Sequence, residues 1–429
     1  MPKILWMSPF SLHDTASGAA VNCHIMLREL KQRGFTIRVC SALIFDAPRG
    51  AVSTFGDLAT FLQQEQRPQW EFDDQGIHYL YTRCASSDER LMSMGEAQTF
   101  YQSFCQQLDE FAPDIVMGYG LSPMPQLCFY EAHQRGISTV YCLTNGDGGR
   151  FHYPHIDLII TDSQATEELY AQRDKLNIRG QGVYWQPQNF LVCEHHPTYV
   201  TLVNPSDAKG VAIFAKLAYI FKSIKPEVKF LAINTRDPFP EAVKKLHVKG
   251  YPQQHPYSAA DFPNVFTVEP QADMRPVYEH TAVLLAPSLW YESWGRVASE
   301  AVYNGIPVLY SSSGGLPEAA AGGGICIDAP EHCRQDYNSL PDDEEIKPWV
   351  EGLLQLLDSS PEAQEHRAQM LERALLKVKN IAATEHVLAA LTPLVLKTQS
   401  LRWQVNTDAE ALAAELNALP DAALPEVSF

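Results

Sequence analysis

The sequence predicts an α/β protein with two doubly wound domains, each a parallel sheet covered by helices on both faces. The chain has 429 residues, more than one ordinary hydrophobic core holds, so two domains are expected. Short apolar segments alternate with segments of helical periodicity, the pattern of parallel strands joined by right-handed helical crossovers. The pattern restarts after a changeover near residue 195, which predicts a second domain of the same class.

The first series of elements begins with KILWM (3–7), a short apolar strand. Residues 18–33 place apolar side chains at helical spacing, and Gly34 ends that helix. Further strands are expected at FTIRVCSA (35–42), DIVMG (114–118), STVYCL (138–143) and DLIIT (157–161). We expect the segment 46–75 to be an irregular, aromatic-bearing insertion.

The second series begins with YVTLVNPSDAKG (199–210), a strand, a polar loop and a helix start. Its further strands are expected at VKFLAI (228–233), NVFTV (264–268), TAVLLAP (281–287), IPVLY (306–310) and GICID (324–328). From about residue 343 the chain is helical and polar. We therefore predict an N-terminal domain (1–195), a C-terminal domain (196–395) and a helical tail (396–429) that packs back toward the first domain.

Composition bounds the class of protein and its partners. Hydrophobic residues make up 45% and charged residues 20%, as in globular proteins. A net charge of −18 argues against a nucleic-acid partner and allows at most peripheral membrane contact. No uncharged apolar run approaches the roughly 20 residues of a membrane span. Nine cysteines occur singly, with no zinc spacing, so we expect reduced thiols, a cytoplasmic protein and no bound metal.

Ligands of such sheets bind beyond the carboxyl ends of the strands, so the loops there are the candidate sites. SLHDTASGAAVN (11–22) lacks the G-x-G-x-x-G of dinucleotide-binding proteins, which disfavours an NAD-dependent oxidoreductase. Its Gly18 lets a ligand approach a helix N-terminus, although a plain tight turn explains the glycine equally well. In NPSDAKG (204–210), Lys209 stands near a helix N-terminus, where a cation opposes the helix dipole and favours a diphosphate ligand.

Two further loops follow the later strands. SSSGGLPEA (311–319) carries Gly314 and Gly315, whose amides suit phosphate or sugar oxygens, although such pairs also mark ordinary turns. WYESWGRVASEAV (290–302) carries Glu292 just before a helix that begins near Trp294 or Gly295. Glu300 lies one to two turns inside that helix, at the margin of its apolar face. The spacing of the two glutamates carries no information alone, so the surrounding loops decide their meaning.

ESWGRVASEAVYNGIPVLYSSSGGLPE resembles the donor-binding segment of glycosyltransferase family 4, the retaining, metal-independent transferases of the two-Rossmann GT-B fold. The likeness extends to VNPSDAKG, DLIITDSQAT and FAPDIVMGYG, and covers the second domain better than the first. It implies a central cleft between the domains and a nucleotide-diphosphate sugar as donor, with no cofactor. The resemblance implies that Glu292 contacts the donor sugar, Glu300 accepts from both ribose hydroxyls, and Lys209, Gly314 and Gly315 bind the diphosphate. Trp294, Gly295 and Gly18 complete the implied donor contacts.

The sequence departs from the family pattern at two positions. Asn204 stands where the family has an arginine, and Arg150 or Arg236 is a possible replacement. Asn145 stands where the family has a histidine near the reacting centre, and we retain it as a candidate catalytic position. His152 is close in the chain, but a loop histidine is more often incidental.

These residues predict a retaining glycosyltransferase. Its acceptor, a glycan, a lipid-linked glycan, a peptide or a small metabolite, is not specified by the pattern. An inactive transferase-like subunit that binds a partner protein, and a sugar-nucleotide epimerase on the same fold, remain alternatives.

Overall fold

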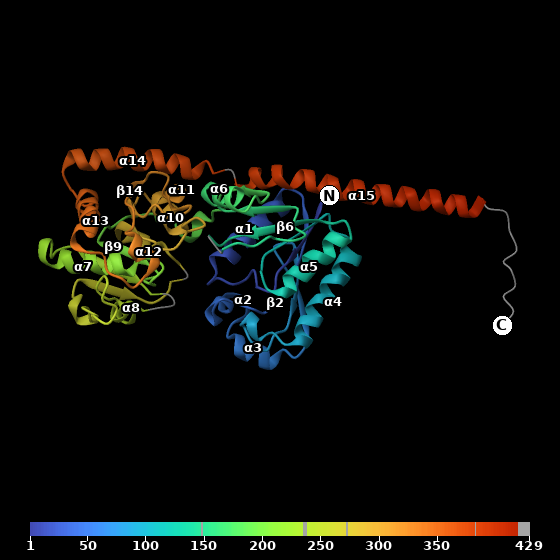
Figure 1. Cartoon of the computed structure of the whole chain (residues 1–429), viewed down its shortest axis with the longest axis horizontal. Helices are drawn as coiled ribbons and strands as arrows, with labels where there is room; N and C mark the ends of the chain where they lie inside the picture. The colour runs from blue at the N-terminus through green and yellow to red at the C-terminus, as the bar shows by residue number, and fades with distance from the viewer. Residues whose placement is uncertain (147–148, 235–237, 272, 382, 419–429) are drawn as a thin grey trace. The chain divides into compact units, whose positions relative to one another are not determined.

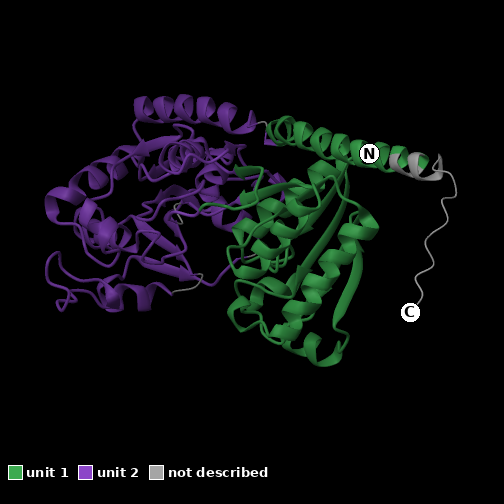
Figure 2. Cartoon of the chain, turned by 45° about the vertical axis from the view of Figure 1, so that its right-hand side comes forward, with its two compact units in different colours: residues 1–142, 152–160, 384–429 green, residues 143–151, 161–383 purple. Residues whose placement is uncertain are grey.

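The computed structural model describes residues 1–429 except 147–148, 235–237, 272, 382 and 419–429 (Figure 1). The chain forms two compact units, each built around a sheet made mostly of parallel strands. Unit 1 contains residues 1–142, 152–160 and 384–429, and unit 2 contains residues 143–151 and 161–383 (Figure 2). The predicted fold class, two Rossmann-like α/β domains with C-terminal helices, is confirmed. The units differ from the expected contiguous ranges, because the chain returns to unit 1 at its C-terminal end.

The sheet that begins in unit 1 has the strand order β3-β4-β2-β1-β5-β6-β7-β8. Its strands are β1 (Lys3–Met7), β2 (Thr36–Ala42), β3 (Gln69–Asp74), β4 (Ile77–Thr82), β5 (Ile115–Gly118), β6 (Ser138–Leu143), β7 (Leu158–Thr161) and β8 (Ile178–Gly180). β1 pairs in parallel with β2 and β5, as apolar strands joined by helical crossovers do. β3 instead runs antiparallel to β4 at the sheet edge, since only a tight turn joins the two.

Helices flank these strands in unit 1. They are α1 (Gly18–Gln32), α2 (Val52–Phe55), α3 (Leu58–Gln64), α4 (Met94–Phe111), α5 (Pro123–Gln134) and α15 (Ala383–Ala418). α1 ends as predicted before Gly34, whose φ of 94° is costly for residues with a Cβ. α15 is one continuous helix, so the expected tail boundary at residue 396 falls inside it.

The segment 46–75 differs from its sequence prediction, because it forms α2, α3 and the edge strand β3. Its aromatic side chains pack on one another: the ring centroids of Trp70 and Phe72 are 4.6 Å apart, and those of Phe55 and Trp70 are 5.1 Å apart. Aromatic pairs of this kind contribute beyond the area they bury. The aromatic residues of 46–75 therefore form a small local core, and the segment is not an irregular loop.

Unit 2 has a fully parallel six-stranded sheet with the order β11-β10-β9-β12-β13-β14. Its strands are β9 (Tyr199–Val203), β10 (Lys229–Ile233), β11 (Val265–Val268), β12 (Thr281–Ala286), β13 (Val308–Tyr310) and β14 (Gly324–Cys326). Its helices are α6 (Gln164–Arg173), α7 (Val211–Ile224), α8 (Phe239–Lys245), α9 (Arg275–Glu279), α10 (Arg296–Tyr303), α11 (Leu316–Ala320), α12 (Glu331–Gln335), α13 (Asp343–Leu356) and α14 (Pro361–Lys379). The predicted strands of this series are confirmed, with ends that shift by at most two residues.

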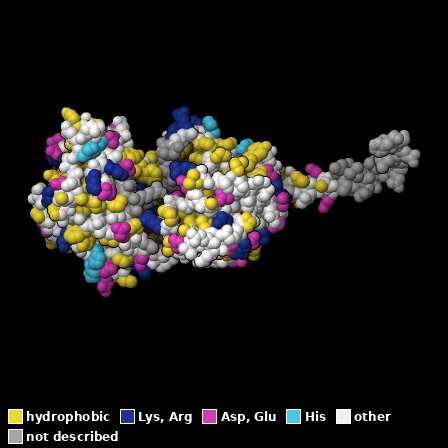
Figure 3. Space-filling view, turned by 90° about the horizontal axis from the view of Figure 1, so that it is seen from below, with side chains coloured by type: hydrophobic (Ala, Val, Ile, Leu, Met, Phe, Trp, Pro, Cys, Tyr) yellow, Lys and Arg dark blue, Asp and Glu magenta, His cyan; other side chains and the backbone are white. Residues whose placement is uncertain are grey.

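Two properties of the surface bear on partners. Within the described residues, no helix combines the length and the apolar character that crossing a membrane requires. Acidic and basic side chains are interspersed on the face shown in Figure 3.

Candidate functional site

The strand order of unit 2 creates a topological switch point between β9 and β12. From β9 the chain proceeds to β10 and β11 on one side, then crosses to β12 on the other. At such a point the loops leaving two neighbouring strands diverge and leave a crevice beyond their carboxyl ends. The loop 204–210 follows β9 and the loop 287–295 follows β12. Lys209 in the first loop and Glu292 in the second therefore both lie at this switch point.

An ion pair joins these two loops. Lys209 Nζ lies 2.6 Å from Glu292 Oε1, and the same oxygen accepts a hydrogen bond from Ser288 Oγ at 2.5 Å. The Glu292 side chain is only 7% exposed, whereas that of Lys209 is 27% exposed. Lys209 Nζ also lies 4.7 Å from the ring centroid of Trp290, a cation–π contact. A buried carboxylate and a reachable ammonium are thus held together at the switch point.

Gly210 allows the two loops to approach so closely. Its φ is 83°, and a Cβ there would lie 2.0 Å from the carbonyl oxygen of Pro287. Leu289 N–H and Trp290 N–H both donate to Ala208 O, at 2.9 and 3.3 Å. The backbone of the loop after β12 is therefore in direct contact with the backbone just before α7.

Gly314 and Gly315 allow the loop after β13 to approach the β12 loop closely. A Cβ on Gly314 would lie 2.1 Å from Glu292 O, and one on Gly315 would lie 2.4 Å from Ser293 O. The amide of Gly315 donates to Glu292 O at 2.9 Å, so it is already used inside the protein. The glycine pair thus lets the loop after β13 support the Glu292 backbone.

Glu300 lies on α10, as predicted, and has two partners. Its Oε2 accepts from Tyr278 Oη at 2.7 Å, and its Oε1 lies 3.6 Å from Arg296 Nε. Burial raises the pKa of the Glu300 carboxyl, while Arg296 and the tyrosine hydrogen bond act in the opposite direction. The carboxylate is thus oriented on both sides, which is what a group that recognises two hydroxyls needs.

Asn204 occupies the first position after β9. Its φ is 66°, a left-handed conformation that asparagine tolerates better than most residues. Its Oδ1 is buried without a hydrogen-bond partner in the described part of the chain. A buried amide oxygen in that state costs free energy unless a donor reaches it. A ligand hydroxyl would be such a donor. The asparagine side chain is uncharged, so it cannot neutralise a phosphate as an arginine would.

The remaining predicted residues of the β12 loop support the backbone. The indole of Trp294 is buried in the core and its Nε1–H donates to Ser299 Oγ at 3.0 Å. Gly295 is the residue before α10, with a φ of 103°, and a Cβ there would lie 2.5 Å from Leu316 Cδ1. Helix α10 therefore begins at Arg296, slightly later than predicted.

Asp162 is a residue of this region that the sequence analysis did not single out. It follows β7, is buried, hydrogen-bonds Ser293 and lies near Arg296. Burial raises its carboxyl pKa to about 7, against the opposing effects of Arg296 and Ser293. The signal was present in DLIITD, where a carboxylate directly follows an apolar strand.

Four further candidate positions remain. Gly18 is the exposed first residue of α1 in unit 1. Asn145 is exposed and follows β6. Arg150 lies 3.8 Å from Asp174, and Arg236 is outside the described residues. Neither arginine is shown to replace the missing charge at Asn204.

Comparison with known proteins points to the same part of unit 2. The sequence profile of the family described as Glycosyl transferases group 1 matches residues 205–357, a range that holds Lys209, Glu292 and Glu300. Over 92 residues the chain is 34% identical to D-inositol 3-phosphate glycosyltransferase of Corynebacterium aurimucosum. That match covers 21% of this chain and 19% of the enzyme, so the chain spans about a fifth of the curated relative.

Solved structures are similar over nearly the whole chain. A glycosyltransferase from Rickettsia africae matches with a TM-score of 0.62 and 13% identity, over 93% of this chain and 98% of that one. Anabaena HepE, solved in complex with UDP and glucose, matches with a TM-score of 0.57 and 14% identity, over 91% of this chain and 100% of that one. At such identities the likeness shows the fold. Residues 205–357 thus carry the sequence profile of group 1 glycosyl transferases, and the chain has the fold of the GT-B glycosyltransferases.

Proposed function

We propose that this protein is a retaining glycosyltransferase that moves a sugar from a nucleotide-diphosphate sugar to an acceptor, without a metal ion on the diphosphate. The observation that carries the proposal is the Lys209–Glu292 pair at the switch point of unit 2. The matching family profile over residues 205–357 supports the same reaction class.

In this proposal Lys209 binds the diphosphate. The residue sits just before α7, a helix of 14 residues whose dipole also favours an anion at its N-terminus. Because its ammonium already faces Glu292, binding of the donor replaces one anionic partner of the lysine by another. A fixed cation and a helix N-terminus stabilise the charge that develops on a leaving diphosphate.

Glu292 and Glu300 bind the two ends of the donor. Glu292 contacts the sugar hydroxyls, and its carboxylate provides a complementary charge for an oxocarbenium-like sugar. Glu300 accepts hydrogen bonds from the ribose hydroxyls while Tyr278 and Arg296 orient it. In the reaction, the bond between the anomeric carbon and the diphosphate oxygen breaks. The acceptor oxygen bonds to the same face of that carbon, and its proton leaves with the diphosphate.

Ligand binding and product analysis test this function. We expect calorimetry to detect UDP, GDP or ADP binding and no NAD binding. With the matching donor, the product should keep the anomeric configuration of the donor by NMR. The rate should also be the same with and without added Mg²⁺ or Mn²⁺. Binding of NAD alone, or an inverted product, would contradict the proposal.

The substitutions at Asn145 and Asn204 favour a second candidate, a transferase-like subunit that binds the nucleotide and transfers nothing. Donor hydrolysis without acceptor separates the two. Turnover of the donor supports the enzyme, whereas nucleotide binding without turnover of any donor in the screen supports the inactive subunit.

A further inference from the structure

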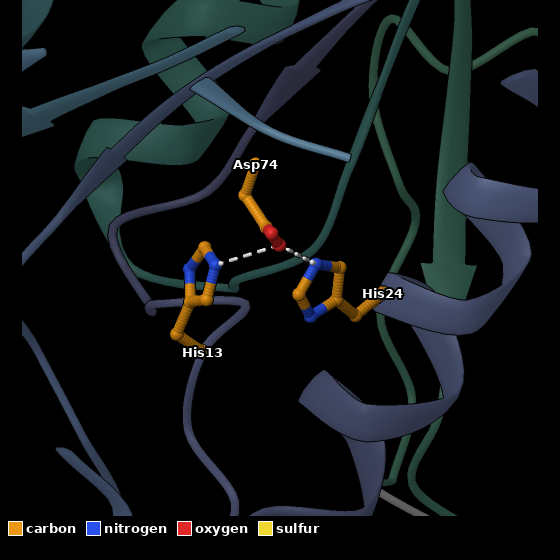
Figure 4. Close-up of side chains that lie close together, drawn as sticks. All are labelled: His13, His24 and Asp74. Carbon is orange, nitrogen blue, oxygen red and sulfur yellow. Dashed lines mark ion pairs between the residues drawn. The ribbon is translucent and has the colours of Figure 1, made fainter. Parts of the chain in front are cut away.

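Unit 1 contains a group of metal-ligating side chains far from one another in the sequence. His13 comes from the loop after β1, His24 from α1 and Asp74 from the end of β3. Figure 4 shows the two imidazoles turned toward the carboxylate from opposite sides. In the described part of the chain this is the one group of three or more such residues whose ligand atoms converge.

The distances within the group are close to those of a tetrahedral zinc site. Zinc binds nitrogen and oxygen at about 2.0–2.1 Å, so two ligands of one tetrahedral ion lie about 3.3–3.4 Å apart. His13 Nε2 lies 3.5 Å from Asp74 Oδ2, and His24 Nε2 lies 3.8 Å from the same oxygen. The three ligand atoms all lie within 4.8 Å of one another.

The outer nitrogens of both imidazoles have partners of the kind that orient metal-binding histidines. His13 Nδ1 lies 2.8 Å from Tyr81 Oη. The ring of His24 hydrogen-bonds the backbone of Leu12, and because its Nε2 faces Tyr79 and Asp74, this bond falls to Nδ1. Outer hydrogen bonds of this kind orient the imidazole rings of metal-binding histidines.

A second observation also points to a ligand at this place. His13 Nε2 is buried without a hydrogen-bond partner in the described part of the chain, and it is aimed at Asp74. The His13 side chain is 7% exposed, whereas that of Asp74 is 32% exposed. Asp74 therefore provides the side from which an ion and a fourth ligand, water, reach the group.

Two neighbours compete with a metal ion for these ligands. Arg28 donates to Asp74 Oδ2 at 2.8 Å, and Tyr79 Oη lies 2.8 Å from His24 Nε2. Both contacts must loosen when an ion binds, so the affinity of the group depends on Arg28. Two imidazoles and one carboxylate disfavour Ca²⁺ and Mg²⁺, which prefer oxygen ligands, and suit Zn²⁺.

We propose that His13, His24 and Asp74 form a zinc site that ties the β1–α1 loop and α1 to the edge strand β3. The ion acts as a cross-link within unit 1, which contains all three of its ligands. The sequence gives no sign of this site, because its ligands are 11 and 50 residues apart and show no zinc spacing.

The test uses the full chain with Zn²⁺ as the probe. The exposed cysteines Cys193 and Cys326 are replaced by serine, since thiolates bind zinc on their own. We expect one equivalent of Zn²⁺ per chain to survive dialysis, measured by elemental analysis, and the melting temperature to rise with added Zn²⁺. Retention of no zinc, together with an unchanged melting temperature, would overturn the proposal.

Variants locate the ion. His13→Gln and His24→Gln should each weaken zinc binding by at least about tenfold. His78→Gln, on the neighbouring strand β4 and paired with Asp73, should leave zinc binding unchanged. Equal affinity in His13→Gln and the parent would overturn the assignment. If these variants do not fold, Arg28→Gln decides: removing the competing guanidinium should tighten zinc binding, and unchanged or weaker binding would contradict the site.

Discussion

Lys209 and Glu292 are 83 residues apart in the chain, yet their charged atoms lie 2.6 Å from each other at the carboxyl ends of neighbouring strands. In this pair the lysine ammonium and the nearly buried glutamate carboxylate neutralise each other, so neither charge needs a ligand to balance it. The pairing also makes the two residues energetically dependent on each other, because removing one leaves the other poorly compensated. Experiments on this pair must therefore separate ligand binding from stability.

Replacing Lys209 tests the diphosphate contact. We expect Lys209→Met to weaken nucleoside diphosphate binding about 10- to 100-fold, since a hydrogen bond to a charged group contributes about 1.5–3 kcal/mol. Binding of the free nucleoside should be unchanged by calorimetry. Lys244→Met, at an exposed lysine of α8 paired with Glu241, is the matched control and should bind as the parent does. Equal losses for nucleoside and diphosphate would point to misfolding.

The double variant Lys209→Met/Glu292→Gln separates the two effects. The single lysine variant leaves Glu292 buried beside Ser288 alone, so its melting temperature should fall. Neutralising the glutamate as well should restore part of that stability without restoring diphosphate binding. Recovery of binding in the double variant would show that the lysine acts only by neutralising Glu292.

Glu292 is expected to matter for turnover more than for folding. Glu292→Ala should lower kcat about 100-fold or more, the scale of losing one preorganised electrostatic group in an active site. Circular dichroism should remain that of the parent, because the side chain contacts Lys209 and Ser288 at a loop and is not part of the apolar core. Activity near that of the parent would remove Glu292 from the proposed site.

Gly210→Ala tests the close approach of the two loops. A Cβ there would lie 2.0 Å from Pro287 O, so we expect the free energy of unfolding to fall by more than the roughly 1–2 kcal/mol that a left-handed backbone alone costs. Gly250→Ala is the control, since Gly250 also has a positive φ of 76° but no atom within 4 Å of a built Cβ. Denaturant unfolding of both variants gives the difference. If both variants lose the same free energy of unfolding, the contact with Pro287 adds no cost at Gly210.

Asp162 predicts a pH dependence of stability. Its folded-state pKa of about 7 lies above the ordinary value of 3.8, so the folded protein holds a proton that the unfolded chain releases. This group therefore lowers stability as the pH rises from about 4 to 7, and the loss is complete above the folded pKa. Asp162→Asn should remove this loss, which is on the order of 4 kcal/mol in full and about 3 kcal/mol between pH 5 and pH 8, since each pKa unit corresponds to about 1.4 kcal/mol. Denaturant unfolding at pH 5 and pH 8 measures it, and an unchanged difference between the two values in Asp162→Asn would contradict the assignment.

The sequence predicted the parallel strands well because buried parallel strands are continuous apolar runs. VKFLAI and TAVLLAP differ from β10 and β12 by a single residue at one end. Strands β4 and β8 were not predicted. The edge strand β3 was also missed, since QWEFDD mixes aromatic and acidic residues and its partner strand decides its conformation.

For the site, the sequence located the loops but not the contacts that they make with each other. Lys209 and Glu292 were placed in the correct loops, but their direct pairing depends on strand order, which no local pattern contains. The glycine pair was expected to present amides to a ligand, whereas Gly315 donates to Glu292 O. Asp162 needed the fold to reveal that its carboxylate is buried beside Ser293.

Helix α15 has a consequence for how the protein forms during synthesis. Thr398 Oγ1 accepts the amide of Ser138 on β6, and Arg402 donates to Asp114 at the start of β5. These contacts complete unit 1, whose first strand begins at Lys3. Nearly the whole chain must therefore leave the ribosome before unit 1 is finished, whereas residues 161–383 of unit 2 emerge as one uninterrupted stretch. Residues 1–142 are thus translated before residues 161–383, but the unit that they belong to is completed later.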